Sequence, residues 1–260
     1  KFRFDRNERL SPIPEFFLKK IKNNLNSNHI TTYPNLKNLY KLMSKDLKIS
    51  RENILITAGS DIAIKTCFEL LIKKNDKIIT IFPTYGMVDV YAQLFQAKQK
   101  KIKYKENLNL NENEILNNLN KKIKLLIIAN PNSPTGTIIK RDTMIKILKK
   151  SKKTNTFVLI DECYFGFCKE TYINKIKSFN NLIISRSFSK AFGMAGCRVG
   201  LLAGNKLIIN KLSKFRPMHE ITYFSAYIGE FFLKNKHLIS DYLKEVKNGL
   251  SYFKNFLKKN

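Results

Sequence analysis

Residues 187–200 read Ser-Phe-Ser-Lys-Ala-Phe-Gly-Met-Ala-Gly-Cys-Arg-Val-Gly. This stretch lies between two short β-rich runs, residues 182–185 and 199–203, and it sets one lysine and one arginine among serines and small residues. Its three glycines precede a predicted strand instead of following one, so they are not a dinucleotide-binding fingerprint. Ligands of an open α/β sheet bind beyond the strand ends, so the stretch predicts a site if the rest of the chain builds such a sheet.

Outward from this stretch, short β-rich runs alternate with amphipathic helical patterns. The predicted strands are residues 53–57, 77–82, 100–104, 124–129, 156–160, 182–185 and 199–203. The predicted helices are residues 16–25, 60–73, 85–97, 112–119 and 141–153, followed by a helical pattern from residue 220 almost to the end. Runs that are apolar on both faces and separated by helices predict a mostly parallel sheet covered on both sides. The fold class is therefore α/β, a three-layer sandwich.

The composition fits one large α/β domain of an intracellular protein. The chain has 260 residues, 43% of them hydrophobic, which excludes a disordered or collagen-like chain and provides a core without disulfides. No apolar run reaches the length of a membrane span, and the N-terminal residues show no signal-peptide core. The four cysteines include no Cys-x-x-Cys pair, and the three histidines have no metal-ligand spacing. We therefore expect a soluble, cytoplasmic protein with no metal site and no membrane partner.

The net charge of +28 raises the question of a nucleic-acid partner. The chain has 40 Lys, 8 Arg and 28 Asn. This bias is typical of the exposed residues of proteins that AT-rich genomes encode. The lysines are spread over different predicted helices and edges, and no stripe of arginines with interleaved aromatic residues is present. The charge is therefore interpreted as solvated surface, and nucleic acid is not the expected partner.

Polar residues follow five of the predicted strands in order. The segments are residues 58–61 (Ala-Gly-Ser-Asp), 83–85 (Pro-Thr-Tyr), 130–136 (Asn-Pro-Asn-Ser-Pro-Thr-Gly), 161–164 (Asp-Glu-Cys-Tyr) and 186–200. The first leads into a predicted helix N-terminus, which is a natural cradle for phosphate. Any one of these segments could be an ordinary turn or helix cap. Five of them in order indicate one site at the edge of the sheet.

These segments resemble the motifs of the fold-type I aminotransferases that depend on pyridoxal phosphate, and the histidinol-phosphate aminotransferase group above all. The motif Ser-x-Ser-Lys-x-x-Gly-x-x-Gly-x-Arg-x-Gly at residues 187–200 matches the lysine motif of that family, and Asn-Pro-Asn-x-Pro-Thr-Gly and Asp-Glu-x-Tyr match its partners. The resemblance runs from about Asp5 to the last residue. It implies pyridoxal 5'-phosphate as cofactor, a small-molecule amino donor such as glutamate, and a keto or aldehyde acceptor, phosphorylated or not.

The resemblance assigns roles to three catalytic residues. Lys190 would form the Schiff base with the cofactor aldehyde and then move the proton between substrate and cofactor carbons. Asp161 would pair with the protonated pyridine nitrogen, and a buried carboxylate at a strand end needs such a cation. Tyr164 would hydrogen-bond the ring hydroxyl. For each residue the alternative is an ordinary structural role: a surface lysine, a helix-capping aspartate or a core tyrosine.

The resemblance also assigns the remaining cofactor contacts. Ser187, Ser189, Arg198 and the backbone N–H groups of Gly59, Ser60 and Asp61 would hold the phosphate, and Tyr85 would stack on the ring. Arg198 is one of only eight arginines in a lysine-rich chain, and phosphate binding is a reason to keep an arginine fork. Tyr33 matches a residue that reaches the phosphate in the neighbouring subunit, which implies a homodimer.

The sequence departs from the family in two respects. Ser133 stands where the family usually has the asparagine that donates to the ring hydroxyl, so that Ser133 itself, a water or Asn132 would have to supply the donor. Family members also continue about a hundred residues further, into a small domain. We therefore expect an N-terminal arm at residues 1–30, the cofactor-binding large domain at residues 31–235, and the start of a truncated small domain at residues 236–260.

Three readings of the function follow. The first is an aminotransferase that resembles histidinol-phosphate aminotransferase, with Arg3, Arg6, Asn7, Glu8, Arg216 and His219 as candidate substrate contacts. The second keeps the cofactor but removes the carboxylate, as threonine-phosphate decarboxylase does, and no residue in the sequence separates it from the first. The third is a basic nucleic-acid-binding or interaction protein on a retired enzyme fold. Intact Lys190, Asp161 and Arg198 argue against the third reading.

Overall fold

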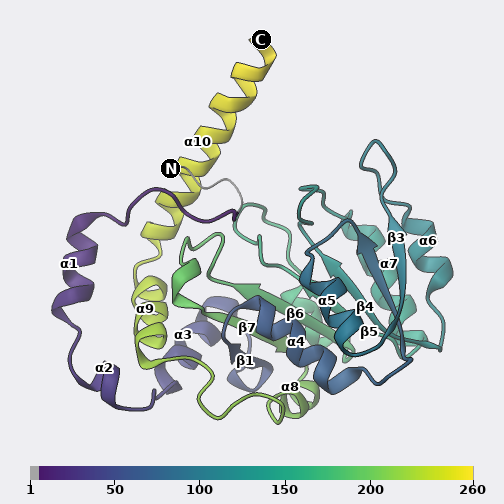
Figure 1. The fold of residues 1–260 in the computed structure, drawn as a ribbon, viewed down its shortest axis with the longest axis horizontal. Coiled ribbons are helices and arrows are strands. Elements are labelled where there is room, and N and C mark those ends of the chain that lie inside the picture. Colours follow the sequence, from purple (N-terminus) through teal and green to yellow (C-terminus); the bar gives the residue numbers. More distant parts are fainter. Residues whose placement is uncertain (1–5, 260) are drawn as a thin grey trace.

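The computed structural model describes residues 6–259, so Arg3 lies outside the described residues. A mixed sheet forms the middle layer, and helices cover both of its faces (Figure 1). This arrangement confirms the predicted α/β sandwich with a mostly parallel sheet.

Seven strands and their intervening helices make up the described part of the chain. The strands are β1 (Ile54–Thr57), β2 (Lys77–Phe82), β3 (Lys98–Lys103), β4 (Ile123–Ala129), β5 (Phe157–Asp161), β6 (Leu182–Ser187) and β7 (Gly200–Gly204). The helices are α1 (Glu15–Asn23), α2 (Asn28–Thr31), α3 (Lys37–Leu47), α4 (Ser60–Leu71), α5 (Met87–Leu94), α6 (Glu112–Asn118), α7 (Arg141–Lys153), α8 (Lys206–Leu212), α9 (Tyr223–Lys234) and α10 (His237–Lys259). Short 3-10 turns cover Arg51–Asn53, Ile173–Lys177 and Ala195–Cys197.

The order of the strands brings their carboxyl ends to one edge. The sheet runs β1-β7-β6-β5-β4-β2-β3, and β7 is antiparallel to both of its neighbours, β1 and β6. All other described pairs are parallel, so only β7 presents its amino end at the edge where the other strands finish. Gly200, at the start of β7, therefore pairs with Thr57 at the end of β1 and with Ser187 at the end of β6.

The two faces of the sheet have separate cores. Leu126 and Ile128 of β4 point into the core under α3, α7 and α9, whereas Leu125 and Ile127 point into the core under α4, α5 and α8. This alternation explains why the central strands read as continuous apolar runs, since both of their faces are buried.

The helix α3 was not predicted from the sequence. Its buried residues, Leu39, Tyr40, Met43 and Leu47, have helical spacing and pack under α9, but lysines and asparagines surround them in the sequence. The stability of α3 therefore comes from the apolar stripe that it buries, and not from a hydrophobic segment.

The N-terminal end of the described chain lies beside α10. The arm, defined here as residues 6–14, runs beside the first turns of α10, and α10 then projects away from the rest of the molecule (Figure 1). Within residues 6–259, none of the helices has the length and apolar character needed to cross a membrane.

Candidate active site

A cavity of about 700 Å³ opens at the edge of the sheet where the strands end. The predicted site residues that line it are Arg6, Asn7, Glu8, Ser60, Asp61, Tyr85, Ser133, Asp161, Tyr164, Ser187, Ser189, Lys190 and Arg198. They come from the arm, from the start of α4 and from the ends of β2, β4, β5 and β6. The fold thus brings together residues that lie far apart in the sequence.

Asp161 is the buried acid of this cavity. It ends β5 with only 7% of its surface exposed, and its carboxylate accepts hydrogen bonds from the hydroxyl of Ser185 at 2.6 Å and the backbone N–H of Cys163 at 3.2 Å. Burial raises the pKa of Asp161 to about 6, although both hydrogen bonds act in the opposite direction. Because burial disfavours the charged form, the Asp161 carboxylate is most stable as an anion here when a cation lies beside it.

Lys190 lies in the loop after β6. Its amine donates to the backbone carbonyl oxygens of Arg6, at 3.0 Å, and of Asn7, at 3.3 Å. The same nitrogen is 5.9 Å from the centroid of the Tyr164 ring. Lys190 therefore presents a primary amine inside the cavity, between the arm and an aromatic ring.

Arg198 and Ser189 also line the cavity, and they are hydrogen-bond donors that no carboxylate among the described residues accepts from. Within the described residues, the Arg198 guanidinium donates to the carbonyl oxygens of Ala58, at 3.2 Å, and Ala195, at 3.5 Å, and to no carboxylate. The hydroxyl of Ser189 is buried and has no partner in the described part of the chain. The helix α4 begins beside them at Ser60, and its first N–H groups add further donors. This set of donors fits a bound anion such as phosphate.

A glycine is required where this anion site is built. Gly59 has a φ of +92°, and a Cβ at this position would lie 2.6 Å from a guanidinium nitrogen of Arg198. Any side chain here would be strained and would displace the guanidinium. Gly59 thus contributes to the site through its backbone, although it does not line the cavity.

Tyr85 stands at the mouth of the cavity and is 41% exposed. Its hydroxyl points to Asp61 at 3.5 Å, and Tyr91 donates to the same carboxylate at 3.0 Å. Burial, reinforced by the charges of Asp61 and Asp161, raises the pKa of Tyr85 to about 12. The phenol therefore stays neutral, as a ring that stacks on a ligand should.

The sequence left open whether Ser133, Asn132 or a water donates to the ring hydroxyl of the cofactor, and the positions of Asn132 and Ser133 differ in the structure. The amide of Asn132 donates to the Pro83 carbonyl oxygen at 3.0 Å and to the Thr135 hydroxyl at 2.8 Å, and its oxygen accepts from Thr84 at 2.8 Å. Asn132 therefore holds its own loop, and Ser133 is the residue of this pair that lines the cavity.

Tyr33 and Arg216 lie away from the cavity. Tyr33 is 77% exposed and stacks on His219 with ring centroids 4.0 Å apart. Arg216 borders a different hollow, near the start of β1, and donates to the carbonyl oxygens of Pro217 and Met218. Within one chain, neither residue is brought to the groups around Lys190.

Sequence reasoning missed two residues next to the acid. Glu162 and Arg186 form a buried ion pair at 2.8 Å between the ends of β5 and β6, and Glu162 also accepts from the backbone N–H of Tyr172. The pair locks the two strands that carry Asp161 and Ser187. The sequence feature that could have indicated this pair is an acid and a base at the ends of two apolar strands: Glu162 follows β5, and Arg186 is the second-last residue of β6.

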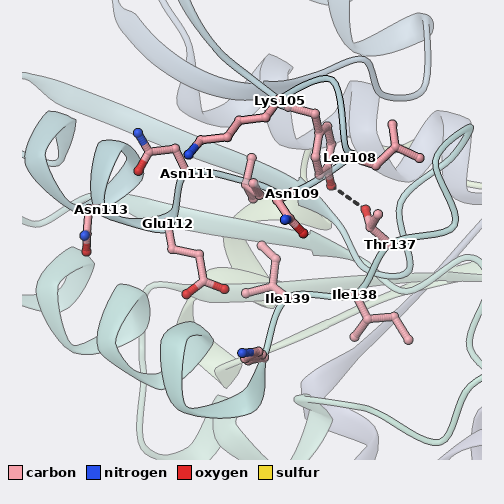
Figure 2. A pocket seen from close by; sticks show the side chains of 12 residues that line it. Lys105, Leu108, Asn109, Asn111, Glu112, Asn113, Thr137, Ile138 and Ile139 are labelled. Atoms are coloured by element: carbon pink, nitrogen blue, oxygen red, sulfur yellow. Dashed lines mark hydrogen bonds between the residues drawn. The ribbon is translucent and has the colours of Figure 1, made fainter.

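A second hollow, of about 580 Å³, lies beside β3 at the edge of the sheet (Figure 2). Lys105, Asn109, Glu112 and Ile139 line it, and Thr137 donates to the Tyr104 hydroxyl at 2.7 Å on one side. None of the groups that the sequence predicted to be functional lies in it.

The chain was compared with known proteins. The model of the family described as "Aminotransferase class I and II" matches residues 3–257. The chain belongs to this family. The enzyme is 31% identical over 255 residues to the histidinol-phosphate aminotransferase of Clostridium kluyveri and 32% identical over 262 residues to that of Clostridium novyi. It covers 72% of the length of each, and these alignments take in 97% and 100% of this chain.

Solved structures show the same fold. The crystal structure of the histidinol-phosphate aminotransferase from Clostridium acetobutylicum superposes with a TM-score of 0.86 at 25% identity, over 97% of this chain and 75% of that chain. The Sinorhizobium meliloti enzyme, solved with pyridoxal 5'-phosphate, gives a TM-score of 0.84 at 20% identity, over 94% of this chain and 67% of that chain. The enzyme is thus a pyridoxal-phosphate-dependent transaminase, similar to histidinol-phosphate aminotransferases.

The residues of the cavity fit this cofactor. The unpartnered hydroxyl of Ser189 and the acid-free guanidinium of Arg198 suit its phosphate, and buried Asp161 suits a cationic ring nitrogen. Lys190 supplies the amine. Residues 6–259 contain no group of three or more His, Cys, Asp or Glu side chains that could hold a metal ion.

Proposed function

We propose that the enzyme transfers an amino group from glutamate to a phosphorylated keto acceptor, giving an amine of the histidinol-phosphate type. The observation that carries this proposal is the convergence of Lys190, Asp161 and the donor set around Arg198 on one cavity. The relatives named above, aligned over almost the whole chain, support the choice of substrate.

The proposed mechanism divides the work among the residues of the cavity. When bound, the cofactor supplies an electron-withdrawing ring that stabilises negative charge on the substrate carbon. Arg198, Ser189 and the N-terminus of α4 hold its phosphate, and Asp161 keeps the ring nitrogen protonated. The Nζ atom of Lys190, close to the arm and Tyr164, would accept the proton from the substrate carbon and pass it to the cofactor carbon instead of returning it.

Tyr164 and Ser133 line the cavity and would supply hydroxyl groups to the ring hydroxyl of the bound cofactor. The Tyr164 hydroxyl accepts a hydrogen bond from the Asn7 amide at 3.0 Å, which orients its own proton away from the arm. It can therefore donate that proton to the ring hydroxyl. Ser133 supplies the second donor that the family usually takes from an asparagine. We propose that Asn7 and Glu8 also contact the substrate, because both line the cavity.

We further propose that the enzyme is a cytoplasmic homodimer. Tyr33, which the family resemblance assigns to the partner's phosphate, is exposed and held in place by its stacking on His219. Arg216 is proposed to act from the same side. Mixing Lys190→Ala and Tyr33→Ala chains tests this, because one site of each hybrid dimer then carries neither change. Recovery of activity on mixing is the expected result, and two inactive parents that stay inactive would contradict it.

The division into domains is also a proposal. Residues 1–30 form an arm, residues 31–235 the cofactor-binding domain, and residues 236–260 the beginning of a second domain. The exposed second half of α10 supports the last boundary, because its apolar residues Leu250, Phe253 and Leu257 have no neighbours to bury them in the described part of the chain.

The deciding experiment is a substrate screen that follows the cofactor spectrum in each half-reaction. Glutamate should convert the bound cofactor to its amine form, and histidinol phosphate should do the same in the reverse direction. Release of carbon dioxide from a phosphorylated amino acid would identify a decarboxylase instead. Salt-dependent retention on DNA by a protein that does not bind the cofactor would support the third reading.

A further inference from the structure

Arg9, in the arm, is packed between the loop of the catalytic lysine and α10. Its guanidinium lies over the ring of Tyr242, 4.6 Å from the ring centroid. Gly193 abuts both side chains, because a Cβ there would lie 2.7 Å from the Cδ atom of Arg9 and 3.2 Å from the Tyr242 ring. The three residues form a stack with no room for another side chain, and Gly193 has the positive φ, +67°, that favours glycine.

The same guanidinium also folds the arm. The Nε atom of Arg9 donates to the carbonyl oxygen of Ser11 at 2.9 Å, and an Nη atom donates to that of Pro12 at 3.2 Å. A lysine could lie over the ring but could not make these two bonds from one rigid fork. The Ser11 hydroxyl donates to Glu245 at 3.0 Å, which is a second tie between the arm and α10.

The residues that Arg9 holds in place reach the reacting centre. Two and three residues before it, the backbone carbonyl oxygens of Asn7 and Arg6 accept from the amine of Lys190. The Asn7 amide donates to Tyr164, and Glu8 lines the cavity. The position of the arm thus sets the surroundings of both Lys190 and Tyr164.

We propose that Arg9 is a positioning residue that clips the arm across the active site by lying over Tyr242 and packing its aliphatic stem against Gly193. The inference rests on the proposed function of Lys190 and goes beyond it, because the clip acts on how substrate is held and not on the chemistry of the amine. None of the hydrogen bonds that the described residues give to Ser189 and Arg198 involves the arm, so we expect cofactor affinity to depend little on the clip.

The first experiment measures amide hydrogen exchange of residues 6–14 in the cofactor-free protein. Arg9→Ala should speed this exchange at least ~10-fold, as expected when a cation–π contact and two hydrogen bonds are removed. Arg9→Lys should give an intermediate rate. The matched control is Arg51→Ala, which removes an arginine that lies over Tyr40 at 5.0 Å, far from the arm. This control should leave the exchange of the arm unchanged.

The second experiment is steady-state kinetics on the loaded enzyme. Arg9→Ala should raise the KM for glutamate about tenfold and lower kcat by a smaller factor, whereas the cofactor dissociation constant should stay within about threefold. A role in stability alone would instead lower the melting temperature and leave the ratio of kcat to KM as in Arg51→Ala.

The outcomes distinguish the clip from the proposed function. Unchanged exchange of the arm in Arg9→Ala, or an unchanged KM, would overturn the clip. If Arg9→Ala does not fold, Arg9→Lys and Ser11→Ala carry the same test, because Arg9→Lys keeps a cation for Tyr242 while losing the fork, and Ser11→Ala removes only the hydroxyl that accepts from Arg9 and donates to Glu245. If the unaltered protein does not transaminate glutamate, the proposed function fails, yet the exchange experiment still decides whether Arg9 holds the arm.

Discussion

The cavity at the end of β5 and the hollow beside β3 have similar volumes, about 700 and 580 Å³, but different construction. The first is assembled from the ends of several strands and contains a buried carboxyl group whose pKa is raised to about 6 by that burial. The second is lined by loop residues such as Lys105 and Asn109 (Figure 2). A site is therefore recognised by buried charge and converging strand ends, and volume alone does not identify it.

The largest expected effect concerns the two lysines of these hollows. Lys190→Ala should abolish the covalent cofactor adduct that borohydride traps on the protein, because no other lysine among residues 6–259 lines the cavity. Lys105→Ala, the matched change in the outer hollow, should leave trapping unchanged. Peptide mapping of the trapped cofactor checks both, and an adduct found on Lys105 would reverse the assignment of the two hollows.

Asp161→Asn should reduce the half-reaction rate on the order of 10²–10⁴-fold, because a neutral amide cannot keep the ring nitrogen charged. The amide can still accept from Ser185 and Cys163, so the variant should fold. Glu112→Gln in the outer hollow is the matched control and should keep the rate of the unaltered enzyme. Stopped-flow spectra with glutamate measure both, and a rate that survives in Asp161→Asn would exclude the proposed role of the acid.

Asp161 also gives the cofactor-free protein a pH dependence. Burial raises the pKa of Asp161 from its ordinary value of 3.8 to about 6, so between these pH values the folded protein holds a proton that the unfolded chain has lost. The contribution of Asp161 to stability is thus greatest below about 3.8, falls as the pH rises to about 6, and above that the charge is a cost. Asp161→Asn should therefore stabilise the cofactor-free protein by about 1–3 kcal/mol at pH 8 and by little at pH 4, as urea unfolding can show.

Arg198→Lys should weaken cofactor affinity about 10–100-fold, because a point charge does not reproduce the two-pronged contact with a phosphate. Arg141→Lys, which alters an arginine on the surface paired with Glu170, is the control and should change nothing. Fluorescence titration with the cofactor measures both dissociation constants. Equal affinities would mean that Arg198 supports the backbone of Ala58 instead of the phosphate.

The smallest effect is expected for Thr137→Val, which removes the hydrogen bond to Tyr104 beside the outer hollow. It should cost about 1 kcal/mol of stability and change cofactor affinity less than twofold. Thermal unfolding and the same titration test it. A large loss of affinity would show that the outer hollow supports the cofactor loop through Thr135 and Asn132.

Much of the sheet could be predicted because its central strands are apolar on both faces and its connections end in polar motifs. β2 and α7 begin and end where the sequence indicated. The helix α3 and the antiparallel direction of β7 could not be predicted. The first depends on a stripe of four apolar residues that is buried only when α9 packs on it, and the second depends on pairing between residues far apart in the chain.

The site residues likewise divide into those that the sequence indicates and those that only contacts between distant segments reveal. Lys190, Asp161 and Arg198 stand in motifs, and the fold brings them to one cavity as expected from strand ends that share an edge. The arm is different, because Arg9 lies in no motif and its contacts with Gly193 and Tyr242 join three distant parts of the sequence. The role of Asn132 as a support for its own loop likewise follows from hydrogen bonds that a sequence does not display.

The contact between Gly59 and Gly200 has a consequence for the synthesis of the protein. A Cβ on Gly200 would lie 2.6 Å from the backbone of Gly59, so these glycines fit together only when β7 has inserted between β1 and β6. During synthesis β1 leaves the ribosome long before β7, so β1 cannot form this pair until β7 is made. Pairing between strands that are far apart in the sequence is also slow. We therefore expect the phosphate cradle to be completed late in synthesis, and the nascent chain to bind its cofactor after β7 is in place.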